Sequence, residues 1–259
     1  MHIRSIPRET VIRPSALPQW LPGSGGSAVL LIHGFTGYPG DMLYLGRRLQ
    51  AAGFAVSIPR LPGHGTNGRD FLQVGWSDWL RAAVDAYLAL SSTHEKVHVA
   101  GLSMGGLLTI LLAAQFEPER IALAAPALAI ANRTAGLTRW LAPFLARMPS
   151  RVGGEEPSED PDHKALFEEY WSWNWVRPTA NLLTLKRMAL RALPRVRSKT
   201  LTIVSKADTT VPADVAELVD RSIPARQRRT LVLERSSHVV VNDVEKERVA
   251  DEIAGWFTE

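Results

Sequence analysis

A serine set between glycines is the first residue in this chain whose surroundings suggest chemistry. Residues 101–105 read Gly-Leu-Ser-Met-Gly, a G-x-S-x-G pattern centred on Ser103. An apolar run, VHVAG, ends at this pattern, and a helix-forming run, LLTILLAA, follows it. A sharp strand-to-helix turn of this kind holds its central residue at positive φ, and the glycines leave the space it needs. The context predicts that Ser103 is presented as a nucleophile, whereas the five residues alone also fit an ordinary turn.

A serine hydroxyl becomes nucleophilic when a histidine takes its proton and an acid orients that histidine. In one known chain order the acid and then the histidine follow the serine, each in a loop after a strand. Asp208 follows the apolar run TLTIV, and His238 follows the run TLVL. Asp214 competes with Asp208 as the acid, but His238 is the only histidine beyond Asp208. We therefore predict a catalytic triad of Ser103, Asp208 and His238.

The negative charge that forms during acyl transfer needs backbone N–H donors. One predicted donor is Met104, directly after the nucleophile. The second is Phe35, because the run AVLLI leads into His33-Gly34-Phe35 and the glycine lets this backbone approach the site. We interpret His33 and His64 as residues that brace neighbouring loops. The sequence lacks H-E-x-x-H and other metal-ligand spacings, so we expect no metal.

The elements that must position these residues follow an alternating pattern. Short, nearly all-apolar runs alternate with helical patterns, which predicts an α/β fold with a mostly parallel central sheet flanked by helices. The expected strands are Ala28–Ile32, Ala55–Ile58, Val97–Gly101, Ile121–Ala125, Thr200–Val204 and Thr230–Leu233. The expected helices are Asp41–Ala52 and Ser77–Ser91, each capped by its first residue, Met104–Phe116, and a last helix to Phe257 that starts at an Asn242/Glu245 capping box.

One segment interrupts the alternation. We expect residues 127–194 to form a small helical cap without a clear strand, inserted into a core of residues 1–126 and 195–259. Leu137, Leu141, Phe144 and Leu145 are spaced as one helix face, which either packs on the core or lines an acyl pocket. Trp171, Trp173 and Trp175 alternate with period two, which suits an extended segment better than a helix. They could wall the substrate entrance, cover the core or form a contact patch, and we nominate Leu141 and Trp171 as substrate-binding residues.

Composition excludes several classes of function. The 259 residues carry a formal charge of +4 that is dispersed along the chain, so we expect no nucleic-acid partner. The chain contains no cysteine, which excludes disulfides and thiolate chemistry. We find no apolar run long enough to span a bilayer and no secretory signal, so we expect a cytoplasmic protein without membrane insertion.

The motifs LLIHGFTGYPGDM, RLPGHG, HVAGLSMGG, SKADTTVP and SSHVVVND occur in this order. Together they resemble the small bacterial carboxylesterases and monoacylglycerol lipases of the α/β-hydrolase superfamily, over about residues 28 to 257. The resemblance implies the α/β-hydrolase fold with a helical cap, the same triad and oxyanion donors, and acyl esters of short or medium chain as substrates. Monoacylglycerol lipases also use a cap carboxylate to bind the alcohol part. Glu168 and Glu169 lie nearby in the tryptophan-rich segment, but the sequence does not identify the equivalent residue.

These observations predict a serine carboxylesterase that forms an acyl-enzyme and needs no cofactor. The same triad could serve a monoacylglycerol lipase, thioesterase, amidase, lactonase or acyltransferase, because it does not specify the leaving group. Haloalkane dehalogenation is disfavoured, since that chemistry uses a carboxylate nucleophile in this superfamily and position 103 is serine. A non-catalytic binding protein on the same scaffold is a remote alternative, because binding alone would not require the serine, the acid and the histidine together. The sequence predicts neither the physiological substrate nor the oligomeric state.

Overall fold

The central sheet has seven strands in a computed structural model that describes residues 11–130, 141–142, 145–150, 161–224 and 227–259. Their order is β1-β3-β2-β4-β5-β8-β9. The bounds are β1 Gln19–Leu21, β2 Ser27–Ile32, β3 Ala55–Ile58, β4 Lys96–Leu102, β5 Arg120–Ala124, β8 Lys199–Ser205 and β9 Arg228–Leu233. All neighbours pair in parallel except β1, which pairs antiparallel with β3 at the edge. The predicted mostly parallel sheet is confirmed, and each expected strand lies within two residues of its observed bounds.

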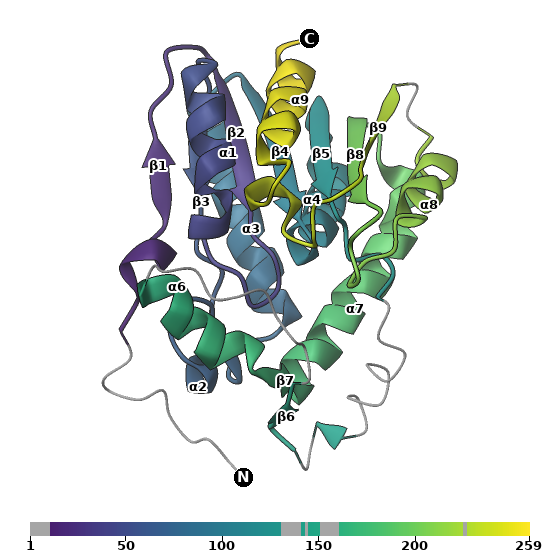
Figure 1. The fold of residues 1–259 in the computed structure, drawn as a ribbon. Coiled ribbons are helices and arrows are strands. Elements are labelled where there is room, and N and C mark those ends of the chain that lie inside the picture. The colour runs from purple at the N-terminus through teal and green to yellow at the C-terminus, as the bar shows by residue number, and fades with distance from the viewer. Residues whose placement is uncertain (1–10, 131–140, 143–144, 151–160, 225–226) are drawn as a thin grey trace.

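Helices cover both faces of this sheet (Figure 1). The main helices are α1 Gly40–Ala51, α3 Trp76–Ser91, α4 Met104–Phe116, α7 Val176–Ala192, α8 Val215–Ser222 and α9 Lys246–Thr258. Helices α1 and α9 bury their apolar residues in one cluster, and α3, α4, α7 and α8 bury theirs in a second. Strand residues divide between the same two clusters, as Val29 and Leu30 do in β2. Burial on both faces explains why the strand sequences are continuously apolar.

The expected helix starts are wrong at three positions. Helix α1 is preceded by Pro39, and Asp41 lies inside it with its carboxyl group accepting the Tyr38 N–H. Helix α3 is preceded by Gly75, whose N–H donates to Asp78, so Ser77 is not the cap. The last helix starts at Lys246, and no capping box joins Asn242 to Glu245.

The segment between β5 and β8 contains strands that we did not expect. Strand β6, Arg147–Pro149, pairs antiparallel with β7, Trp173–Trp175, so the expected extended segment is confirmed for Trp173 and Trp175. It is wrong for Trp171, which ends a π-helical turn. Helix α6, Pro161–Leu166, and the π-helical turn η3, Phe167–Trp171, precede β7. Helix α7 packs on α3 and α4, whereas α6, β6 and β7 gather beyond one end of the sheet (Figure 1). The division into a core and a cap of residues 127–194 stays a prediction.

A short helix, α2 Gly68–Phe71, packs against this segment. A Cβ atom at Gly68 would lie 2.0 Å from the Trp175 ring, so glycine lets the tryptophan pack directly on the backbone. Tyr170 donates to the Gly63 carbonyl at 2.9 Å and accepts the Thr66 N–H at 3.0 Å. These contacts join the inserted segment to the loop that follows β3. Among the residues that the structure describes, no helix meets the length and hydrophobicity needed to cross a bilayer.

Candidate active site

Ser103 occupies the turn between β4 and α4. Its φ of 54° and ψ of −110° confirm the expected positive φ. The neighbouring glycines make this turn sterically feasible, because a Cβ atom at Gly101 would lie 2.2 Å from the Gly105 carbonyl oxygen. The Ser103 N–H donates to the Ala124 carbonyl at 2.8 Å, which ties the turn to the end of β5. The serine is therefore held at the carboxyl edge of the sheet by backbone hydrogen bonds to the segment at the end of β5, because its carbonyl also accepts the Ala127 N–H at 3.2 Å.

Ser103, His238 and Asp208 form one hydrogen-bonded series. The Ser103 hydroxyl donates to His238 Nε2 at 2.9 Å, and His238 Nδ1 donates to Asp208 Oδ2 at 2.8 Å. The three residues follow β4, β9 and β8, so parallel pairing brings their loops to one edge. The competing acid, Asp214, immediately precedes α8, and its side chain makes no cap hydrogen bond there. The geometry can pass a proton from the serine to the histidine while the carboxylate fixes the imidazole tautomer.

Asp208 is held as a carboxylate by its hydrogen bonds. Its side chain is almost fully buried, and burial alone would raise the pKa. The hydrogen bond from His238 and the N–H groups of Thr210 and Val211, at 2.7 and 2.9 Å, outweigh burial and lower the pKa of Asp208. A fixed negative charge therefore faces His238 Nδ1, where it can stabilise a protonated ring.

The predicted oxyanion donors flank the serine. Met104 is the first residue of α4, so its N–H has no acceptor within the helix and points out of the helix N-terminus. Phe35 lies in the loop after β2, and a Cβ atom at the preceding Gly34 would lie 3.4 Å from Ser103 Cβ. The Phe35 ring packs against Phe71 at 5.3 Å between centroids and anchors this loop. Both amides thus belong to backbone next to Ser103.

Two buried histidines brace the loop that carries Phe35. His33 donates from Nδ1 to the Gly34 carbonyl at 2.9 Å, and its Nε2 accepts the Leu61 N–H at 3.1 Å. His64 donates from Nδ1 to the Pro62 carbonyl at 3.0 Å, and its ring packs 5.0 Å from that of His33. Burial lowers the pKa of His33 to about 4 and that of His64 well below its usual value. The bracing interpretation of His33 is confirmed, and the ring acts there as a neutral donor and acceptor.

Acid should destabilise the fold through these histidines. His98, buried in β4 against Phe257, also has its pKa lowered to about 4 by burial. The unfolded chain binds protons below about pH 6.5, whereas the folded rings stay neutral until about pH 4, so stability falls as pH drops through this window. Burial raises the pKa of Asp41 to about 7, so this carboxyl group favours the folded state as pH falls. The three histidines together outweigh this single group. We expect Tm to fall by roughly 5–10 °C between pH 7 and pH 4.5.

Calorimetry at several pH values measures this dependence. A His98→Phe variant keeps an aromatic ring between Phe54 and Phe257 but cannot be protonated, so its Tm should fall less. An equal fall in the variant and the parent would remove His98 from the explanation.

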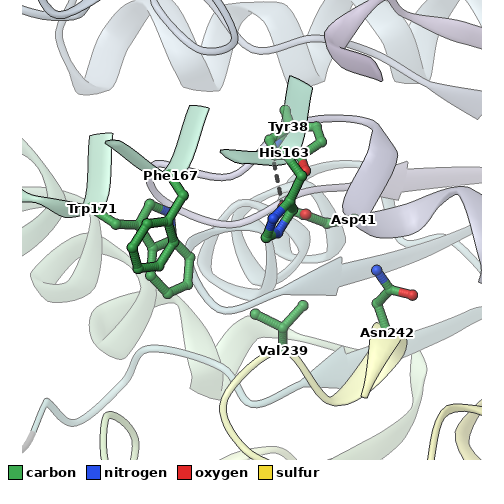
Figure 2. Close-up of a pocket in the computed structure, with 7 residues that line it drawn as sticks. All are labelled: Tyr38, Asp41, His163, Phe167, Trp171, Val239 and Asn242. Carbon is green, nitrogen blue, oxygen red and sulfur yellow. Dashed lines mark hydrogen bonds between the residues drawn. The ribbon is translucent and has the colours of Figure 1, made fainter. Parts of the chain in front are cut away.

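A small cavity of about 70 Å³ lies beside the triad. Its lining comes from the inserted segment, from the loop after β2 with the start of α1, and from the segment after β9 (Figure 2): Tyr38, Asp41, His163, Phe167, Trp171, Val239 and Asn242. The rings of Phe167 and Trp171 stack at 5.7 Å and form one wall. Val239 directly follows His238, so the cavity borders the histidine loop. Of the two nominated substrate-binding residues, Trp171 lines the cavity and Leu141 does not.

The other apolar residues predicted to share one helix face of the inserted segment are either exposed or outside the described residues. Leu141 is 38% exposed, and Leu145 is comparably exposed. The predictions for Leu137 and Phe144 fall outside the described residues. Leu141 is therefore neither buried in the core nor part of the cavity lining.

Sequence reasoning missed the polar residues of the cavity. The sequence pattern presents Asp41 as a helix cap, and chain order disfavours His163 as the base because it precedes Asp208. The two acidic residues considered in the inserted segment do not line the cavity: Glu169 accepts the Gly68 N–H at 2.6 Å, and Glu168 is exposed. The available signal was closeness in sequence: Asp41 lies six residues after the predicted oxyanion donor Phe35, and Asn242 lies four residues after the predicted base His238.

The described residues contain no group of three or more histidine and acidic side chains arranged to hold a metal ion. The arrangement at the sheet edge consists of a hydroxyl, an imidazole, a carboxylate and backbone amides. Chemically, these groups suit acyl transfer through a covalent serine intermediate.

Comparisons with known proteins agree with this arrangement. Residues 29–252 match the model of the "Alpha/beta hydrolase family". The chain is 32% identical over 245 residues to a thermostable monoacylglycerol lipase of Bacillus sp. (strain H-257), covering 90% of this chain and 91% of that protein. It is 25% identical over 230 residues to a carboxylesterase of Bacillus subtilis (strain 168), covering 88% and 91%.

Among solved structures, one described as belonging to the metagenome-derived lipolytic enzymes LipS and LipT superposes with a TM-score of 0.85. It shares 30% identity and covers 96% of this chain and 100% of that chain. The matching family model spans most of the sequence, and these relatives extend over nearly the whole fold. The chain belongs to the alpha/beta hydrolase family.

Proposed function

We propose that this protein is a serine carboxylesterase in which Ser103, His238 and Asp208 form the catalytic triad. The observation that carries the proposal is the hydrogen-bonded series from Ser103 Oγ through the imidazole to the Asp208 carboxylate, at 2.9 and 2.8 Å. The relatives named as a monoacylglycerol lipase and a carboxylesterase support ester hydrolysis as the reaction class. The substrates we propose are acyl esters of short or medium chain.

The reaction proceeds through an acyl-enzyme. His238 Nε2 takes the hydroxyl proton as Ser103 Oγ bonds to the ester carbonyl carbon, and the carbonyl oxygen becomes an oxyanion held by the Phe35 and Met104 amides. The tetrahedral intermediate collapses, the bond to the alcohol oxygen breaks, and His238 returns the proton to that oxygen. Water then attacks the acyl-enzyme with the same proton transfers, releasing the acid and restoring Ser103. Asp208 stays ionised throughout and stabilises the protonated imidazole.

Labelling with a fluorophosphonate tests the proposed nucleophile. The folded protein should be modified stoichiometrically at Ser103, located by mass spectrometry, and lose hydrolysis of p-nitrophenyl esters in parallel. A series of p-nitrophenyl esters from acetate to palmitate then reports chain-length preference, and thioester and amide substrates separate the alternatives that share the triad. Absence of modification in folded protein contradicts the proposal.

The cavity beside the triad favours a hydroxylated leaving alcohol, as in a monoacylglycerol. The leaving oxygen must lie near His238 Nε2 to be protonated, and Val239 places the cavity next to that loop. His163 Nδ1 is buried and has no hydrogen-bond partner among the described residues, and Asp41 and Asn242 add further polar groups. A pocket built to hydrogen-bond hydroxyl groups discriminates against a plain alkyl group, because a buried polar atom such as His163 Nδ1 would then stay unpaired.

Paired substrates with one acyl chain test this second candidate. We expect His163→Leu and Asn242→Leu each to lower kcat/KM for 1-decanoylglycerol by about 5–10-fold, the effect of one hydrogen bond, with ethyl decanoate changed less than about twofold. The exposed neighbour Lys164, changed to leucine, is the matched control. Equal losses on both esters would show that the cavity does not recognise the alcohol.

A further inference from the structure

The loop that leads from β9 to His238 is held by one carboxylate. Glu245 Oε2 accepts the N–H groups of Arg235 and Ser236, both at 2.9 Å, and the Ser236 hydroxyl at 3.0 Å. The N–H of Glu234 approaches Oε1 at 3.5 Å. These donors lie between the histidine and Leu233, the last residue of β9 that pairs with β8. Glu245 therefore supplies the acceptors for the backbone that carries His238.

The same carboxylate stays charged under all ordinary conditions. Its side chain is 9% exposed, and the Arg248 guanidinium lies 3.7 Å from Glu245 Oε1. Burial would raise the pKa of Glu245, but the donated hydrogen bonds outweigh it and lower the pKa to about 2. Hydrogen bonds to an ionised acceptor are stronger than neutral ones, so the loop is held firmly.

Ser236 also joins this loop to the loop of the acid. Its carbonyl oxygen accepts the Ser205 hydroxyl at the end of β8, and Ser205 Oγ accepts the Ala207 N–H at 3.3 Å. Ala207 directly precedes Asp208. Side-chain hydrogen bonds thus run from Glu245 through Ser236 and Ser205 to the residue next to the acid, alongside the contact between His238 and Asp208.

A neighbouring carboxylate holds the residue directly before the histidine. Asp243 Oδ2 accepts both the N–H and the hydroxyl of Ser237, the latter at 2.6 Å. Glu245 and Asp243 together fix the backbone on the amino side of His238. The imidazole is left to make its two hydrogen bonds without reorganisation of its loop.

We propose that Glu245 is a positioning residue for the reaction, setting the register of His238 between Ser103 and Asp208 through the backbone of residues 234–236. The inference rests on the proposed function and adds a residue outside the triad and the oxyanion donors. A displacement of about 1 Å at a reacting group can cost about 10²-fold in rate, so loss of this anchor acts on chemistry rather than on substrate binding.

Kinetics of Glu245→Leu test the proposal. Leucine is similar in size but accepts no hydrogen bonds, so we expect kcat for a p-nitrophenyl ester to fall by about 30–100-fold, with KM within about twofold. Labelling by a fluorophosphonate should slow to a similar degree, because it also requires proton transfer to His238. Glu245→Gln keeps an acceptor oxygen for Arg235 and Ser236, so its kcat should stay within about fivefold of the parent.

The matched control is Glu247→Leu, because Glu247 is exposed and lies in the first turn of α9, two residues away. It should leave kcat unchanged. A folded Glu245→Leu protein with kcat reduced less than tenfold, or with a loss confined to KM or Tm, overturns the proposal. If that variant does not fold, Ser236→Ala decides: a fall in kcat of at least about threefold at constant KM supports the anchor, and a smaller one overturns it. Unlabelled and inactive parent protein would instead contradict the proposed function itself.

Discussion

Replacing Ser103 with alanine is expected to lower kcat/KM for a p-nitrophenyl ester by at least about 10⁴-fold. The change removes the oxygen that forms the bond to the acyl carbon, while the oxyanion amides and His238 remain. Without that oxygen no acyl-enzyme can form, and the remaining groups can only assist direct attack by water. The measurement is steady-state hydrolysis together with fluorophosphonate labelling, which should disappear completely.

Alanine is an informative replacement because it keeps the Cβ atom. The strain at φ 54° is therefore the same in the variant and the parent, and Tm should change little. Lost activity in this variant cannot be attributed to a relaxed turn. Ser92→Ala, at an exposed site at the end of α3, is the control and should keep full activity. Esterase activity retained by the Ser103 variant would remove this residue from the mechanism.

The sequence was sufficient to predict the sheet because the parallel strands are buried on both faces. Continuous apolar runs such as AVLLI and TLTIV carry that information locally. Strand β1 is not predictable in this way because it has three residues, exposes Trp20 by 54% and pairs at the edge. Strands β6 and β7 are equally short, and their pairing joins residues that are far apart in the chain.

The candidate site likewise contains residues that the sequence predicts and residues that it does not. Ser103, Asp208 and His238 each follow a predictable strand, so chain order and strand ends are enough to nominate them. Asp41 and Glu245 instead gain their contacts from backbone that only the folded chain brings near. The sequence pattern presents each as part of a helix start, because a carboxylate near a helix N-terminus is usually a cap. Local patterns cannot distinguish a carboxylate that caps its own helix from one that holds a neighbouring loop.

The order of the elements makes the site depend on close backbone packing. Helix α4 begins at the carboxyl edge of β4, directly beside the end of β2, and the loop that carries Phe35 leaves from that same point. The nucleophile and the oxyanion loop therefore share one contact surface, in which glycine at position 105 allows the approach. Any side chain there has to displace one of the two.

Replacing Gly105 with alanine should consequently damage stability and catalysis together. A Cβ atom would lie 2.1 Å from the Ile32 carbonyl oxygen and 2.8 Å from that of His33. Both contacts are backbone, so no side chain can rotate away, and the β2 end or α4 must move. We expect the free energy of unfolding, measured with urea, to fall by about 3 kcal/mol, and kcat/KM of the folded protein to fall by about 10²-fold.

Gly255→Ala is the matched control for this prediction. Gly255 also lies in a helix, α9, but a Cβ atom added there would meet no described atom within 4 Å. Alanine there should raise stability by about 0.5–1 kcal/mol through helix propensity and leave kinetics unchanged. If Gly105→Ala lost stability but kept its kcat/KM, the Phe35 loop would not depend on this contact. The proposed oxyanion donor Phe35 would then have to be held by other contacts. Loss of both stability and kcat/KM would instead show that the Phe35 loop and the nucleophile turn depend on the same glycine.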